Sequence, residues 1–297
     1  MVEGGLNVSH WPGNRTPAHL RADTSTEMAL KLARDPGREE WLRGVSIVTN
    51  NHFDTDGLLS VFAVLRPEEA LRHEKEMVRA ARTGDFGEFT TPEAFKFDSV
   101  VTAFDDDRRS PIASEIRGRS EHQRYQIVYD HLLSLLPGLL SSAPAHKDLW
   151  AARLSAYMGS MMRIRDVARV REHEAARLTV IETDEPLDEM ARFNVARHHR
   201  VLTATRSEGG ILYETAFQVF SWFDTVTPPR GTRFDLAGVA AEFDRLEPPG
   251  SGHWTYTGDD SLEARLYRAG PGGEPVPSAL PLETVESHLV RIFAARP

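Results

Sequence analysis

Cysteine is missing from the sequence altogether, and lysine is scarce, since only 4 of the 35 Lys and Arg residues are Lys. The lack of cysteine excludes disulfide bonds, thiolate catalysis and cysteine zinc sites. Any bound metal must therefore use carboxylate or imidazole ligands. The preference for arginine is more typical of a GC-rich genome than of a particular function, although arginine also suits phosphate binding.

A surplus of positive charge is missing as well, since the 297 residues carry a formal net charge of −9. Proteins that bind long nucleic acids usually carry a basic surplus that neutralises phosphates, so we expect no such partner. No apolar run approaches the roughly 18 residues of a membrane-spanning helix. Residues 1–7 also lack the basic and apolar segments of a signal peptide. We therefore predict a cytoplasmic protein with no membrane partner.

The first half of the chain alternates short β-branched runs with helical segments. Thr24 to Glu27 fits a helix capping box, and further helices are expected at Leu58–Leu65 and Pro67–Thr83. Strands are predicted at Leu6–Ser9, Val45–Thr49 and Val100–Phe104. This order, with short links, predicts an α/β domain over residues 1–145, in which helices cover a parallel sheet.

The second half of the chain, residues 146–297, has a different pattern. A long helix is expected at Asp148–Ala176, and it would place Arg171 to Glu174 on a solvated face. Antiparallel strands are predicted at Leu178–Thr183, Arg200–Arg206 and Ile211–Phe220, the last two joined by a turn at 207–210. We expect a smaller α+β domain that is a candidate for substrate binding, with the domain boundary within Ser141–Ala145.

Potential metal ligands cluster in the loop Asn50–Gly57, directly after the predicted strand at 45–49. His52, Asp54 and Asp56 bring an imidazole and two carboxylates close together in the chain, and the glycine at 57 lets the backbone turn sharply. Carboxylates that converge in this way repel each other unless a cation lies among them. The alternative interpretation is an Asp-rich turn that only caps the following helix.

Further candidate ligands follow two other predicted strands. Asp105 and Asp106 come after residues 100–104, and His10 comes after residues 6–9. Ligands of parallel sheets bind at the carboxyl ends of the strands, so these side chains should gather beside the loop at 50–57. We predict a divalent metal site formed by His52, Asp54, Asp56 and Asp105, with Asp106 as the substitute for Asp105 and His10 as an additional ligand. Oxygen and imidazole ligands suit Mn²⁺, our first expectation, and also Mg²⁺ or Zn²⁺.

The segment Phe53–Ser60, Phe-Asp-Thr-Asp-Gly-Leu-Leu-Ser, resembles the first motif of the DHH phosphoesterase superfamily, and Asp105 stands where the second motif would lie. The resemblance covers residues 45–107 and implies a DHH-like domain, a pair of Mn²⁺ or similar ions, and a phosphodiester or phosphoanhydride substrate. The third motif, Asp-His-His, is missing. Its nearest match is Asp130-His131, whose surroundings predict a pair on a helix surface instead. The glycine-rich C-terminal motif of the superfamily is absent too.

Two other resemblances are weaker or less informative. The haloacid-dehalogenase phosphatases use Asp-x-Asp-Gly-Thr directly after a strand. Here Asn50 to His52 interrupt the strand before Asp54, and Leu58 stands in place of the threonine. The whole chain also resembles an uncharacterised actinobacterial protein family.

These observations predict a metal-dependent hydrolase that uses metal-activated water on a small, anionic, phosphorylated substrate. Asp54, Asp56 and Asp105 would hold the metal, and His52 would be a ligand or an acid. Two alternatives stay open. One is a DHH-like binding module that has lost catalysis, and the other is a metalloenzyme with non-phosphate chemistry in secondary metabolism.

Overall fold

The computed structural model describes residues 5–142, 145–228, 231–250 and 252–295. This part of the chain contains twelve α-helices and a six-stranded sheet, which confirms the predicted mixed α/β class. The chain divides into two compact units: unit 1 comprises residues 1–155 and 223–228, and unit 2 comprises residues 156–222 and 229–297. The predicted boundary within Ser141–Ala145 includes residues 143–144, which lie outside the described part. None of the described helices has both the length and the apolar character of a bilayer-spanning segment.

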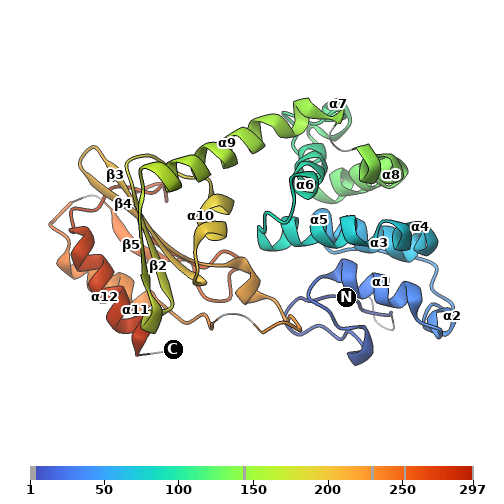
Figure 1. Ribbon diagram of the computed structural model, residues 1–297, viewed down its shortest axis with the longest axis horizontal. Coiled ribbons are helices and arrows are strands. Elements are labelled where there is room, and N and C mark those ends of the chain that lie inside the picture. Colours follow the sequence, from blue (N-terminus) through green and yellow to red (C-terminus); the bar gives the residue numbers. More distant parts are fainter. Residues whose placement is uncertain (1–4, 143–144, 229–230, 251, 296–297) are drawn as a thin grey trace. The chain divides into compact units, whose positions relative to one another are not determined.

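Unit 1 is built from helices, and its described residues contain no β-strand (Figure 1). The predicted parallel sheet of residues 1–145 is therefore wrong. The core gathers around the third helix, whose Leu58, Leu59 and Phe62 are fully buried. The helices are α1 (Ser25–Arg34), α2 (Arg38–Trp41), α3 (Thr55–Leu65), α4 (Pro67–Arg72), α5 (Glu74–Phe86), α6 (Pro92–Phe104), α7 (Ala113–Ile116), α8 (Glu121–Ser142) and the N-terminal part of α9 (Lys147–Asp166).

The three strands predicted in unit 1 are not formed. Residues 6–9 and 45–49 adopt neither strand nor helix, and Val100–Phe104 is the last part of α6. The apolar run of α6 fits a buried helix as well as a buried strand, so its period alone does not decide between them. The start of the segment does decide, because Thr91 caps the helix through the Ala94 N–H at 3.1 Å and Pro92 occupies its first turn.

The predicted capping box of α1 is confirmed. Thr24 Oγ1 accepts a hydrogen bond from the Glu27 N–H at 3.2 Å, and the Glu27 carboxylate accepts one from the Thr24 N–H at 3.0 Å. The box fixes where α1 begins and where its first N–H groups point. The buried helix predicted at 58–65 is confirmed as part of α3, and the helix predicted at Pro67–Thr83 is present as α4 and α5, separated at His73.

Unit 2 contains the sheet, in which every pair of neighbouring strands is antiparallel except β2 and β3. The parallel pair is connected through α10 (Glu189–Val195). The helices α11 (Ala237–Leu246) and α12 (Leu282–Ala294) cover one face of the sheet, and α10 lies on the other (Figure 1). The antiparallel pair predicted at 200–206 and 211–220, with its turn at 207–210, is confirmed as β3 and β4. The strand predicted at 178–183 is present as β2, but it pairs in parallel with β3 and is antiparallel only to β1. In sheet order the strands are β1 (Arg169–His173), β2 (Leu178–Thr183), β3 (Arg200–Ser207), β4 (Gly210–Phe217), β6 (Arg265–Ala269) and β5 (His253–Tyr256).

The long helix predicted at Asp148–Ala176 is wrong at its C-terminal end. The helix α9 ends at Asp166, and residues 169–173 form the edge strand β1, in which Arg171 pairs with Val180 of β2. Arg171 and His173 both contact Glu286 of α12. The segment has a local helical preference, but pairing with β2 and the charged contacts with α12 outweigh it. Sequence periodicity does not register either of these interactions.

Candidate metal centre

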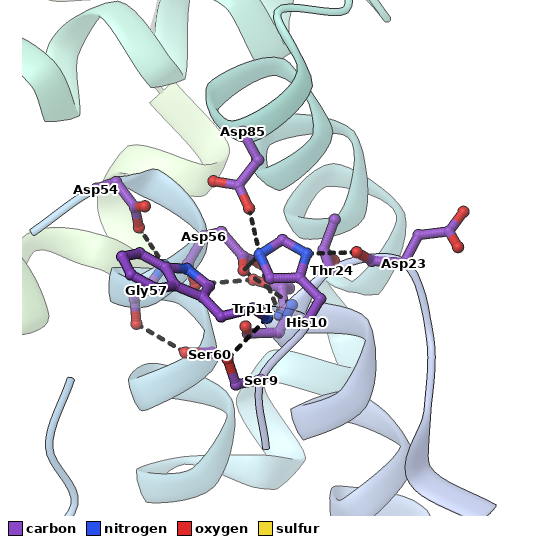
Figure 2. Close-up of polar contacts among 12 residues, drawn as sticks. Ser9, His10, Trp11, Asp23, Thr24, Asp54, Asp56, Gly57, Ser60 and Asp85 are labelled. Atoms are coloured by element: carbon purple, nitrogen blue, oxygen red, sulfur yellow. Dashed lines mark hydrogen bonds and ion pairs between the residues drawn. The ribbon is translucent and has the colours of Figure 1, made fainter. Parts of the chain in front are cut away.

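Three titratable side chains from distant parts of the sequence meet inside unit 1 (Figure 2). His10 Nε2 lies 3.0 Å from Asp85 Oδ2 and 3.8 Å from Asp56 Oδ2, and no side chain of the three is more than 3% exposed. One possible ligand atom from each lies within 4.8 Å of the other two. Within the described ranges this is the one group of its kind that could hold a metal ion.

Asp56 is held by the first turn of α1. Its two carboxylate oxygens accept backbone hydrogen bonds from Ser25 at 2.8 Å and Thr26 at 2.7 Å. The Thr26 hydroxyl also donates to the Asp56 carbonyl at 3.1 Å. Two N–H groups at a helix N-terminus bind a carboxylate through charge-assisted hydrogen bonds. The capping box of α1 therefore fixes the N–H groups of Ser25 and Thr26 that bind Asp56.

His10 presents only one ring nitrogen to the carboxylates. Its Nδ1 donates a hydrogen bond to the backbone carbonyl of Asp23 at 2.5 Å, and its ring stacks on Phe223 at 4.1 Å between centroids. The Nε2 atom is left to face Asp56 and Asp85 (Figure 2). Metal-binding histidines are commonly oriented in this way, because the hydrogen bond of one nitrogen fixes the tautomer and aims the other.

Asp85 lies near the end of α5, and the sequence analysis did not single it out. Burial, followed by the negative charges of Asp56 and Asp54, raises the pKa of Asp85 well above its ordinary value. A proton on Asp85 therefore relieves the repulsion between the two buried carboxylates when no cation is present. A divalent ion would relieve the same repulsion and displace the proton.

Asp85 follows Gly84, where α5 passes close to α6 and to the start of α3. A Cβ atom at Gly84 would lie 2.9 Å from both Asp98 Oδ1 and Thr55 Cβ, so a side chain there would disturb the first turn of α3. Asp98 was also missed. Its carboxylate accepts hydrogen bonds from Thr55 at 2.6 Å and from Arg153 at 2.5 Å, which ties α6 to the start of α3.

His52 and Asp54 form a second polar pair, in the loop before α3. Asp54 is the N-cap of α3, since its Oδ1 accepts the Gly57 N–H at 2.6 Å, and its Oδ2 contacts His52 Nε2. The helix-capping interpretation of this loop is therefore correct for Asp54. Burial lowers the pKa of His52, but the hydrogen bond and charge of Asp54, with the charge of Asp56, outweigh it and leave the pKa raised.

Gly57 is required for space rather than for an unusual backbone angle. A Cβ atom at this position would lie 1.7 Å from Nδ2 of Asn50 and 2.9 Å from Oδ1 of Asp54. Its φ is not positive, which corrects the expectation of a sharp glycine turn. The Asn50 side chain lies against α3 and donates to the Tyr129 hydroxyl at 3.3 Å.

The other predicted ligands lie outside the group formed by His10, Asp56 and Asp85. Asp105 follows the last residue of α6, where its carboxylate accepts a hydrogen bond from Arg124 at 2.6 Å, and Asp106 accepts the Arg108 N–H at 2.9 Å. A strand at residues 100–104 would have placed both carboxylates beside the loop at 50–57, whereas the end of α6 places them next to Arg124 and Arg108. Asp130 and His131 lie on the surface of α8, as expected, with Gln126 and Glu115 as partners.

A cavity of about 750 Å³ opens beside the cluster within unit 1. His10, His52, Asp54 and Asp56 all contribute to its lining. The rings of Trp11 and His52 lie 5.0 Å apart in this lining. A small molecule that enters the cavity would therefore meet both polar pairs.

The fold and the site together define a mixed α/β protein with a buried His-Asp-Asp cluster in its helical unit. The whole chain, residues 1–297, matches DUF6687, a protein family of unknown function, and it belongs to that family. No curated protein and no solved structure matches the chain. The function must therefore be inferred from the chemistry of the site.

Proposed function

We propose that the protein is a metal-dependent hydrolase acting on a small phosphorylated substrate, with His10, Asp56 and Asp85 holding the metal. The observation that carries this proposal is the approach of His10 Nε2 to both carboxylates, at 3.0 and 3.8 Å, beside a cavity. Three protein ligands leave coordination positions for water and substrate, which is the arrangement of catalytic rather than structural metal sites.

The residues present fit a divalent ion. The Asp23 carbonyl occupies Nδ1 of His10, two N–H groups of α1 hold the Asp56 carboxylate in place, and Asp85 can exchange its proton for the cation. One imidazole nitrogen with two carboxylates suits Mn²⁺, which remains our first choice, with Mg²⁺ and Zn²⁺ as alternatives.

A bound divalent ion would lower the pKa of a coordinated water and offset the charge of a phosphoryl group. His52 and Asp54 would supply the proton that the leaving oxygen needs. Although burial opposes it, the contact with Asp54 keeps the pKa of His52 raised, which favours the protonated form of the imidazole that can donate. Its side chain is 32% exposed and lines the cavity. We assign His52 as the acid that protonates the leaving oxygen, with Asp54 orienting its ring.

This proposal revises the ligand set that the DHH resemblance implied. The first-motif residues Asp54 and Asp56 remain at the site, while Asp85 of α5 takes the place assigned to Asp105. We retain a relationship to the DHH phosphoesterases as part of the proposal, supported by the segment Phe53–Ser60.

Calorimetric titration of chelator-treated protein with Mn²⁺ tests the metal site. We expect wild-type protein to bind Mn²⁺, and the Asp56→Asn and Asp85→Asn variants to bind it more than about tenfold less tightly. Asp106→Asn is the matched control, because Asp106 is an aspartate of unit 1 that lies outside the cluster. Turnover of p-nitrophenyl phosphate should follow the same order. Equal Mn²⁺ binding by all four proteins, or no binding by any, would contradict the proposal.

A binding module without catalysis is the second candidate, and one observation favours it. A proton on Asp85 lets the two carboxylates and His10 satisfy one another without a cation. In that case methylphosphonate would bind equally well to protein with and without Mn²⁺, and no phosphate ester would be hydrolysed. Tight Mn²⁺ binding without turnover of any phosphate ester would instead favour a metalloenzyme with non-phosphate chemistry.

A further inference from the structure

The cavity beside the proposed metal centre has two kinds of lining. His10, His52, Asp54 and Asp56 are polar and can take part in the reaction. Much of the remaining lining is aliphatic, and it includes Val8, Leu42, Val45, Ile47, Val61 and Val64. A cavity of about 750 Å³ is large enough to enclose most of a small organic molecule.

Two of the aliphatic residues face the outside rather than the protein core. Ile47 is 76% exposed and Val45 is 42% exposed. Both lie in residues 45–50, which form neither helix nor strand, so internal packing does not explain their apolar character. Exposed apolar side chains grouped at a cavity are typical of a surface that a ligand covers.

Basic side chains are nearly missing from this lining. Arg15 is the only Arg or Lys among the described residues that line the cavity, whereas Asp54 and Asp56 each add a carboxylate. A polyphosphate or an oligonucleotide carries several negative charges, and such ligands are usually bound by several Arg or Lys side chains. The charge of the cavity therefore suits a ligand with one phosphate group.

We infer that the substrate is a phosphate monoester with an apolar alkyl or aryl body, an inference that rests on the proposed function. The phosphate meets the metal centre, and the apolar body covers Val45 and Ile47. The water oxygen bonds to phosphorus as the ester P–O bond breaks. One water proton stays on the phosphate, and the other replaces the proton that His52 gives to the leaving oxygen. The products are inorganic phosphate and an apolar alcohol or phenol.

Octylphosphonate and methylphosphonate cannot be hydrolysed, and comparing them separates the contribution of the apolar body from that of the headgroup. We expect octylphosphonate, below its micellar concentration, to bind the Mn²⁺-loaded full chain at least about tenfold more tightly than methylphosphonate, measured by calorimetry. Methylenediphosphonate, which carries more charge, should bind no more tightly than methylphosphonate. Among substrates, octyl phosphate should have a higher kcat/KM than inorganic pyrophosphate.

The variant Ile47→Asp tests whether the apolar body lies where we infer. It should reduce the preference for octylphosphonate to near unity and leave Mn²⁺ binding unchanged. Leu65→Asp is the matched control, since Leu65 is 53% exposed at the end of α3 and does not line the cavity, and this variant should keep the preference.

Equal affinity for octylphosphonate and methylphosphonate, or a preference for methylenediphosphonate, would overturn the inference. The proposal of a metal-dependent hydrolase would still stand. A preference for octylphosphonate that Ile47→Asp leaves intact would overturn it too, because the body would then bind elsewhere. Absence of Mn²⁺ binding would remove the proposed function and the inference together.

Discussion

The backbone carbonyl of Asp23 accepts the Nδ1 proton of His10 at 2.5 Å, and this contact decides which nitrogen of His10 faces the carboxylates. Thr24 caps α1, which leaves the Asp23 side chain for other partners. Its carboxylate instead accepts the N–H groups of Val226 at 3.0 Å and Thr227 at 2.8 Å. The segment 223–228 thus holds both the ring of His10 and the residue that orients it.

Removing the aromatic ring that stacks on His10 should weaken metal binding without touching a ligand. In the variant Phe223→Ala the imidazole gains freedom to rotate, and we expect Mn²⁺ affinity to fall by about tenfold, the usual effect of losing a residue that supports a ligand. Phe223→Leu fills most of the space and should lose less. Calorimetry on both variants, with unfolding curves to show that unit 1 remains folded, provides the measurement. An unchanged affinity in Phe223→Ala would show that the stacking does not position His10.

Gly57→Ala should destabilise unit 1 by about 1–3 kcal/mol, because the new methyl group would overlap the Asn50 side chain. The double variant Asn50→Ala/Gly57→Ala should be less destabilised than the sum of the single changes, since it removes the overlap. Gly138→Ala in α8 is the control. It meets no atom within 4 Å and should stabilise the helix by up to about 1 kcal/mol. Urea unfolding of the four variants measures these free energies, and strict additivity of the pair would refute the argument.

Thr24→Ala should lower the free energy of unfolding by about 1 kcal/mol. The substitution removes the hydroxyl that accepts the Glu27 N–H, and the Glu27 carboxylate then has only the backbone N–H of residue 24 as its partner in the capping box. Thr24→Ser keeps the hydroxyl and should lose much less. Since the first turn of α1 also holds Asp56, Thr24→Ala should weaken Mn²⁺ binding as well. Destabilisation by the serine variant as large as that by the alanine variant would point to packing of the Thr24 methyl group instead of capping.

His199 should make unit 2 sensitive to acid. Burial, with the charge of the neighbouring Arg200, lowers the pKa of His199 to about 3, whereas an unfolded histidine has a pKa near 6.5. Between pH 3 and pH 6.5 the unfolded state binds a proton at His199 that the folded state does not bind. The free energy of unfolding therefore falls as the pH decreases below 6.5. We expect a loss of about 2 kcal/mol at pH 5 relative to pH 7.

Unfolding of wild type, His199→Gln and His19→Gln at several pH values checks this expectation. The glutamine at 199 should flatten the dependence between pH 5 and pH 7, whatever its effect on absolute stability. The His19 variant should behave as wild type, because that side chain is 49% exposed. A slope that survives in His199→Gln would assign the acid sensitivity to other groups.

Local sequence signals predicted those parts of the fold that local interactions decide. The capping box at Thr24 and the hairpin at 207–210 depend on neighbouring residues, and both are present. Residues 100–104 were misjudged because an apolar run satisfies the period of a strand and of a buried helix, and the cap at Thr91 lies outside the run. The prediction for residues 169–173 was wrong because helical periodicity does not register strand pairing with Val180 or the contact of Arg171 with Glu286, which lies 115 residues along the chain.

The candidate site shows the same difference between residues that local patterns reveal and residues that only tertiary packing brings together. His10, Asp54 and Asp56 were recognised from residue type and spacing, and His10 and Asp56 do lie together. Asp85 had no such signal, since an aspartate near the end of a charged helix is usually solvated, and only tertiary packing brings it against His10. Asp105 was assigned through the wrong secondary structure, and its carboxylate binds Arg124.

Because residues 223–228 belong to unit 1, the polypeptide returns to that unit after forming the first four strands of unit 2. During translation His10 is made 213 residues (223 − 10) before Phe223, the aromatic residue that stacks on it. A nascent chain that stops short of this point carries His10, Asp56 and Asp85 without the ring that orients the imidazole. Maturation of the proposed metal centre is thereby tied to synthesis of the segment 223–228, and a product that terminates before this segment would lack the ring that orients His10.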